Sequence, residues 1–196
     1  MKEEKHANKR NQIIASTLKL IGEVGYEKAS IRAICESASI SIGTFYHYFK
    51  DKGDLLDTML RGIDDYLEKE VRPLLSNESE SENLKFFAVS FAGRAVSTGA
   101  LYGGIISNSN VPLPSTPEER AAEMGRALYR IPEGIIAQGQ ENGEFSRRIH
   151  ASETASYLIM CLRGCAMDWA RRGYSYNLTD YVERFMDLFT ASLTAN

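Results

Sequence analysis

The sequence is poor in cysteine, which limits the kinds of site it can build. Its three cysteines, Cys35, Cys161 and Cys165, are an odd number without metal-binding spacing. They offer neither a disulfide framework nor a zinc motif. They fit a reducing compartment, where cysteine mostly behaves as a small buried hydrophobe. Cys161 and Cys165 are four residues apart, which suits either a redox pair or two packed side chains.

Histidine is also scarce, and recognised catalytic motifs are missing. The three histidines are His6, His47 and His150, and none belongs to an HExxH, GxSxG, Walker-type or Cys/His pattern. His150 has no nucleophile beside it in the sequence. We therefore expect no enzyme, no metal site and no cofactor.

Long apolar runs are absent as well. No stretch approaches the ~18 apolar residues that a membrane span needs. The first twelve residues, "MKEEKHANKRNQ", are charged and lack the apolar core of a signal peptide. The expected location is the cytoplasm, without a membrane partner.

The net charge of −3 conceals an asymmetry along the chain. Residues 1–52 contain nine Lys and Arg against six Asp and Glu, a balance of +3, so the remainder carries −6. A mildly basic head on an acidic body allows a polyanionic partner for the head. The same balance also fits a chance distribution of charges.

Apolar residues recur at helical spacing nearly everywhere, which predicts an all-α protein of about nine helices. In the first helix the apolar stripe is Ile14, Leu18 and Ile21. The segment "TGALYGGIISNSNVPLPSTP" reads as a short irregular helix followed by a loop. That first helix is expected over 8–24, and a short helix capped by Ser30 follows it. The remaining expected helices are 42–49, 52–73, 82–97, 117–142 with a kink at Pro132, 151–172 and 178–193. Ser41, Asp51 and Thr116 are the expected N-caps for the helices that follow them, and either Asn177 or Thr179 is the expected N-cap of the last helix.

The stretch "ASISIGTFYHYFKDKGDLL" combines rings with polar tips and small residues. Residues 30–49 have the form of a helix-turn-helix, whose second helix enters the DNA major groove with its electropositive N-terminal end. Phe45 and Phe49, one helical turn apart, would fix that helix to the head. A compact helical corner with an aromatic core is the alternative interpretation.

The expected DNA contacts follow from residue chemistry. Ile42 has no polar group and can contact only a thymine methyl or a sugar, whereas Tyr46 and His47 offer donors to phosphates. Lys52 begins the next helix, where a cation and backbone N–H groups can bind the same strand. The complete expected set is Ser30, Ser41, Ile42, Gly43, Thr44, Tyr46, His47 and Lys52.

The stretch from Lys9 to Leu56 resembles the DNA-binding head of the TetR family of transcriptional regulators. The matching elements are Gly25-Tyr26, Ser30, Ile34, Ser41, Gly43 to Tyr46, Phe49, Lys52 and Leu55-Leu56. They cover roughly the first quarter of the chain. Two departures weaken the helix ends: Ala33 replaces a capping acid, and Ser39 replaces the usual turn glycine, at some cost in backbone strain.

This resemblance implies a DNA-binding domain over 1–52 and a ligand-binding and dimerisation domain over 53–196. It implies a homodimer on a palindromic operator, most commonly a repressor, released by a small apolar or aromatic molecule. The alternative is a helical small-molecule-binding or dimeric interaction protein that binds no operator. The operator, the regulated genes and the inducer are not specified by the sequence.

Two sets of body residues are candidates for these roles, and each of them can equally be core. The expected effector contacts are Phe87, Phe91, Arg94, Tyr102, Met124, Met160, Arg163 and Met167. The expected dimer contacts, on the last two helices, are Leu158, Leu162, Trp169, Phe185 and Phe189.

Overall fold

The computed structural model describes residues 2–76, 79–97 and 116–194. Within these ranges the chain forms nine α-helices and no named strand, with one isolated antiparallel bridge between Phe145 and Thr194. The all-α prediction is therefore confirmed. None of the described helices has the length and apolar character required to cross a membrane.

The described residues divide into two compact units, 2–62 and 63–97 together with 116–194. The division falls within helix α4 (Lys52–Tyr66). The functional limits 1–52 and 53–196 stay a prediction, because a division by contacts does not establish what each part binds.

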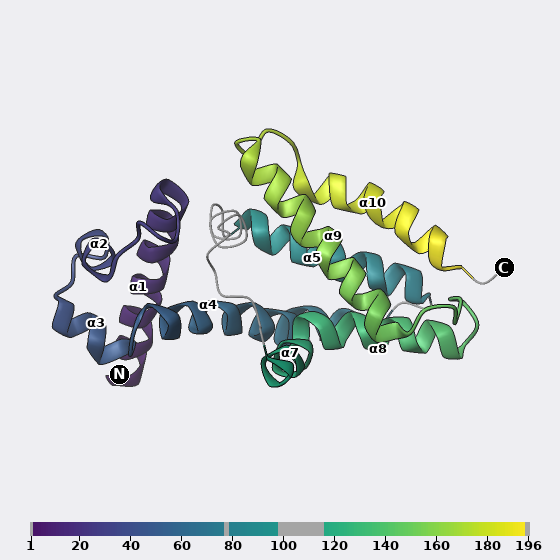
Figure 1. Ribbon diagram of the computed structural model, residues 1–196, viewed down its shortest axis with the longest axis horizontal. Helices are drawn as coiled ribbons and strands as arrows, with labels where there is room; N and C mark the ends of the chain where they lie inside the picture. Colours follow the sequence, from purple (N-terminus) through teal and green to yellow (C-terminus); the bar gives the residue numbers. More distant parts are fainter. Residues whose placement is uncertain (1, 77–78, 98–115, 195–196) are drawn as a thin grey trace. The chain divides into compact units, whose positions relative to one another are not determined.

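The first unit contains α1 (Lys2–Val24), α2 (Ile31–Ser37), α3 (Ile42–Tyr48) and the start of α4, with α2 packed against both α1 and α3 (Figure 1). The most buried stripe of α1 is Ile13, Thr17 and Ile21. The expected stripe began one residue later, and its members Ile14 and Leu18 are only partly buried. Thr17 is tolerated inside because its hydroxyl donates to the Ile13 carbonyl at 2.8 Å.

Helix α4 changes character before its expected end at Pro73. A π-helical turn, Leu67–Val71, follows it, and then a 3₁₀ turn, Arg72–Leu74. Proline has no N–H, and its ring crowds the carbonyl four residues earlier, here that of Lys69. The wider turn accommodates this, since the Arg72 N–H donates to the Leu67 carbonyl, five residues back.

The second unit is a helical bundle. It contains α5 (Glu80–Ser97), α7 (Pro117–Met124), α8 (Ala127–Glu141), α9 (Ala151–Arg171) and α10 (Leu178–Leu193). Helix α5 packs against α8 and α10, and α8 packs against α9 (Figure 1). The core includes Leu84, Phe87, Phe91, Ile136, Leu158, Ile159, Leu162, Val182 and Met186.

The prediction of a single kinked helix over 117–142 is wrong. Thr116 does form the expected capping box with Glu119, but α7 ends at Met124 and a new helix starts at Ala127. The new start is held by Asp64 of α4, whose carboxylate accepts from the Arg126 side chain at 2.8 Å and from the Leu128 N–H at 3.3 Å. This distant carboxylate supplies the cap that the local sequence lacks.

Two other expectations have clear outcomes. Pro132 lies buried inside α8 and does not interrupt it. Of the two expected caps of α10, Asn177 is the one that caps it, because its side chain accepts from the N–H groups of Thr179 and Asp180. The expected irregular helix and loop over 98–117 lie mostly outside the described residues.

Candidate nucleic-acid interface

The turn between α2 and α3 sets the position of the exposed helix. Ser30 caps α2 by accepting from the Ala33 N–H at 3.2 Å. At the end of α2, the Ser39 N–H donates to the Glu36 carbonyl and the Ile40 N–H donates to the Cys35 carbonyl. This is a Schellman motif, and it places Ser39 in the left-handed region at φ 52°. The strain inferred for serine at this glycine position is therefore present.

Helix α3 is capped at one end and anchored along one side. The Ser41 hydroxyl accepts from the Thr44 N–H at 3.0 Å and lies 2.9 Å from the Thr44 hydroxyl. Phe45 and Phe49 are almost fully buried, with ring centroids 5.7 Å apart. The two phenylalanines therefore fix α3 to the unit, as expected, and leave its opposite side outward.

The outward side of α3 consists of Ile42, Gly43, Tyr46 and His47, which we call the α3 outer face. Ile42 is 51% exposed and Tyr46 is 55% exposed, and the two side chains lie one helical turn apart on this face. A Cβ on Gly43 would lie 3.8 Å from the Ser41 hydroxyl, an ordinary contact. The fold itself thus leaves room for a side chain at this glycine.

The Lys52 ammonium binds within the protein in this structure and is not directed outward as a phosphate donor would be. Its ammonium donates to the Tyr26 carbonyl and lies 3.8 Å from the centroid of the Tyr26 ring. Burial lowers the pKa of this ammonium, and the nearby charge of Glu27 opposes the change. In this conformation Lys52 ties the start of α4 to the segment after α1.

The start of α4 is also capped reciprocally. The Asp51 carboxylate accepts from the Asp54 N–H at 2.8 Å, and the Asp54 carboxylate accepts from the Lys50 N–H at 2.9 Å. Asp51 therefore caps α4 as expected.

The structure gathers six of the eight expected DNA residues, Ser41, Ile42, Gly43, Thr44, Tyr46 and His47, onto α3 and its cap. Thr44 is half-buried, and its hydroxyl faces Ser41. Sequence reasoning did not anticipate Arg10, whose guanidinium donates to the Thr58 hydroxyl at 2.9 Å and lies over the Phe49 ring. It also missed His6, which contacts α3. No spacing rule links these distant positions.

The expected effector residues have mixed positions in the second unit. Phe87 and Phe91 are buried on α5, whereas Met160 on α9 is 60% exposed. Arg163 donates to the Glu123 carboxylate at 3.3 Å and lies over the Tyr129 ring. Met124 and Met167 are partly buried, and the Arg94 guanidinium lies over the Tyr66 ring. Tyr102 is outside the described residues.

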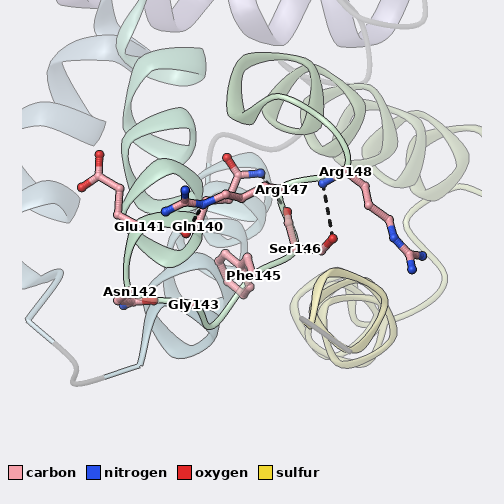
Figure 2. Close-up of a pocket in the computed structure, with 8 residues that line it drawn as sticks. All are labelled: Gln140, Glu141, Asn142, Gly143, Phe145, Ser146, Arg147 and Arg148. Atoms are coloured by element: carbon pink, nitrogen blue, oxygen red, sulfur yellow. Dashed lines mark hydrogen bonds between the residues drawn. The ribbon is translucent and has the colours of Figure 1, made fainter.

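A surface pocket of about 370 Å³ lies where α8 ends (Figure 2). None of its lining residues belongs to the expected effector set. Arg147 donates to the Gln140 carbonyl at 2.8 Å, and Arg148 extends to the opposite side of the loop. The two guanidinium groups therefore do not converge on a single anion.

The expected dimer residues fall into two groups. Leu158, Leu162 and Trp169 are buried by their own chain, so the structure places them in its core and not on a surface that a partner can cover. Phe185 and Phe189 are partly exposed on α10. Beside them are exposed Tyr181 and Leu188, while Tyr157 and Met160 are exposed on α9.

Comparison with known proteins identifies the family. A profile described as bacterial regulatory proteins, tetR family, matches residues 13–59. The HTH-type transcriptional regulator BetI of Serratia proteamaculans is 33% identical over 193 residues, covering 94% of this chain and 92% of that protein. The chain belongs to the TetR family. It is a helix-turn-helix transcriptional regulator, and the resemblance of its first quarter to this family is confirmed.

One further relative is similar to this chain in sequence, and two solved structures are similar to it in fold. BetI of Cronobacter sakazakii is 34% identical over 97 residues, and this match spans about half of each protein, 47% of this chain and 48% of that one. The fatty acid degradation regulator FadR from Bacillus halodurans superposes with a TM-score of 0.79 at 20% identity, covering 93% and 98% of the two chains. FadR from Bacillus subtilis in complex with stearoyl-CoA superposes with a TM-score of 0.74 at 21% identity, covering 93% of this chain and 98% of that chain. These two solved structures show that this chain shares their fold.

Proposed function

We propose that this TetR-family regulator binds a palindromic operator as a homodimer, represses transcription, and is released by a small, apolar or aromatic molecule. The observation that carries the proposal is the α3 outer face. Ile42, Gly43, Tyr46 and His47 are exposed together, while Phe45 and Phe49 hold the helix from behind. Apolar and aromatic side chains gathered on one helix face, with polar groups beside them, are typical of a surface that a partner covers.

In this proposal each residue of the α3 outer face has a defined role on the duplex. Gly43 lets the helix backbone approach the groove, and Ile42 contacts a thymine methyl or a sugar. Tyr46 and His47 donate to backbone phosphates, which position the helix without reading sequence. Thr44 contributes to sequence preference from the edge of this face. Ser30 and Ser41, as N-caps, keep both helices in place.

Lys52 completes the contact to the same strand, at the start of α4. For this it exchanges its bond to the Tyr26 carbonyl for a phosphate oxygen. The exchange is feasible because the lysine side chain is long and the ammonium is only partly buried.

We assign the dimer contact to the outer faces of α9 and α10. On α10, Tyr181, Phe185, Leu188 and Phe189 recur at helical spacing along the edge of the stripe formed by the buried Leu178, Val182 and Met186, and they extend it towards solvent. A helix whose apolar stripe is wider than the part covered by its own chain needs two packing partners. The first is its own core and the second is another copy of the chain. Such a dimer presents two α3 helices to half-sites about one DNA turn apart.

The effector site belongs in the second unit, near Phe87, Phe91, Met124 and Met167. Arg163 is already paired with Glu123, which compensates its charge. Because this guanidinium is compensated, the apolar side chains around it favour an apolar effector over an anionic one. Release of DNA then requires that the effector bind the two conformations of the dimer unequally.

The test is selection of bound duplexes from a random library, followed by titration of the selected duplex at two salt concentrations. The proposal expects a palindrome whose affinity falls steeply with salt. Tyr46→Ala should weaken binding to all duplexes, and Tyr174→Ala, an exposed tyrosine of the second unit, is the matched control. Absence of any enriched sequence, or equal effects of the two variants, would contradict the proposed interface.

A further inference from the structure

The N-terminal part of α1 contributes a ring to the edge of the α3 outer face. His6 is exposed, and its ring centroid lies 4.4 Å from that of Tyr48 and 5.5 Å from that of His47. The His47 and Tyr48 rings are themselves 5.1 Å apart and nearly perpendicular. Three rings from two helices thus meet at the C-terminal end of α3.

This cluster does not resemble a core contact. His6 and His47 are both exposed, so their association buries little apolar surface, and both imidazoles keep access to solvent. The arrangement instead places a second imidazole beside one that already belongs to the α3 outer face. A duplex that His47 contacts therefore passes within reach of His6.

We propose that His6 is a further DNA-contacting residue, which forms with His47 an imidazole pair that binds backbone phosphates and takes up protons on binding. The inference rests on the proposed role of the α3 outer face. It assigns a function to a residue of α1, outside the helix-turn-helix.

The charge balance around the pair explains why protons would be linked to binding. Tyr48 of α3 packs against both imidazoles, and the bases Lys9 and Arg10 follow His6 on α1 with their cations directed to Gln12 and Thr58. Histidine is the side chain that changes charge between about pH 5 and 8. A protonated imidazole is a cation, and the duplex phosphates supply the counter-charge that favours it.

The expected consequence is a pH-dependent affinity that depends on both histidines. The selected duplex is titrated near pH 8 and near pH 6 at constant ionic strength, with wild type, His6→Gln, His47→Gln and the double variant. We expect wild type to bind about three- to tenfold more tightly near pH 6 than near pH 8. This corresponds to an average uptake of about a quarter to a half of a proton per complex, since one full proton corresponds to tenfold per pH unit. Each single variant should lose part of this gain, and the double variant nearly all of it.

Glutamine keeps a polar side chain of similar reach but cannot gain a proton, so the pH profile separates DNA contact from structural support. His150→Gln, which alters an exposed histidine of the second unit, should retain the full gain. Thermal unfolding of each variant at both pH values checks folding. The inference is overturned if His6→Gln keeps the full pH dependence, or if it weakens binding equally at both pH values. If wild type selects no duplex at all, it is the proposed function that fails.

Discussion

The carboxylate of Glu144 accepts a hydrogen bond from the backbone N–H of Ser81 at 2.8 Å, although 63 positions separate the two residues. The same carboxylate accepts from the Glu80 N–H and the Ser79 hydroxyl, each at 2.8 Å. A side chain from the loop between α8 and α9 therefore caps the first turn of α5. These three hydrogen bonds join two parts of the bundle that are distant in sequence.

Glu144→Gln should lower the stability of the protein near neutral pH by about 0.5–2 kcal/mol, the usual value of an N-cap. Burial on its own would raise the pKa of the Glu144 carboxyl, but the hydrogen bonds from Ser81, Glu80 and Ser79 outweigh it and lower the pKa from 4.5 to about 2. A pKa lowered by folding contributes stability above the unfolded value. This contribution should decline as the pH falls from 4.5 towards 2.

Urea unfolding of wild type and Glu144→Gln over this pH range measures the effect, and the two curves should converge in acid. Glu141→Gln, on an exposed residue at the end of α8, is the control and should match wild type throughout. A constant difference between wild type and Glu144→Gln at every pH would show that the carboxylate charge is not responsible.

Ser39→Gly should stabilise the protein by up to about 1 kcal/mol. Ser39 adopts φ 52°, a conformation that costs energy for any residue with a Cβ but not for glycine. The gain is reduced because glycine also increases the entropy of the unfolded chain. Thermal unfolding measures it, and Ser37→Gly, at the last position of α2, should destabilise. A loss of stability in Ser39→Gly would show that the backbone of Ser39 is not strained.

Gly43→Ala should fold at least as stably as wild type and yet bind the selected duplex more weakly. The space around Gly43 admits a Cβ, and alanine is favoured over glycine within a helix by roughly 0.5–1 kcal/mol. A methyl group would, however, separate the helix from the groove. Thermal unfolding tests the predicted stability, and duplex titration tests the predicted loss of affinity. Unchanged affinity would mean that DNA does not approach Gly43.

Gly139→Ala should destabilise the second unit by about 1–3 kcal/mol. A Cβ on Gly139 would lie 2.2 Å from the Phe145 ring, which is buried and has little room to move. Gly134→Ala, on the same helix with no atom within 4 Å of the added Cβ, should be neutral or stabilising. Comparison of the two variants by thermal unfolding isolates the clash, and equal effects would refute the close packing.

Leu188→Glu should convert the dimer to monomers and weaken operator binding on the order of 100-fold, because the second head loses its linkage to the first. Leu188 is 76% exposed on the outer face of α10, so the substitution leaves the core intact. Leu74→Glu alters a leucine that is 59% exposed outside α9 and α10, and it should remain dimeric. Analytical ultracentrifugation distinguishes the two variants. A Leu188→Glu protein that stays dimeric would show that the dimer interface does not include this face of α10.

The sequence by itself determined the elements whose causes are local. Ser30, Ser41, Thr116 and Asn177 cap the helices that they were expected to cap, because an N-cap bonds N–H groups only two or three residues away. The anchoring of α3 by Phe45 and Phe49 followed from helical spacing in the same way. The ordered motif around these residues was sufficient to indicate the family.

Only the tertiary structure decided features that depend on partners far along the chain. Asp64 starts a new helix after Gly125, and Glu144 caps α5, through contacts that no spacing rule contains. The placement of His6 beside His47 likewise needs two helices to meet. Local patterns indicate that a side chain faces a core, but which elements form that core, and therefore which apolar face of α9 or α10 stays exposed, is settled by long-range packing.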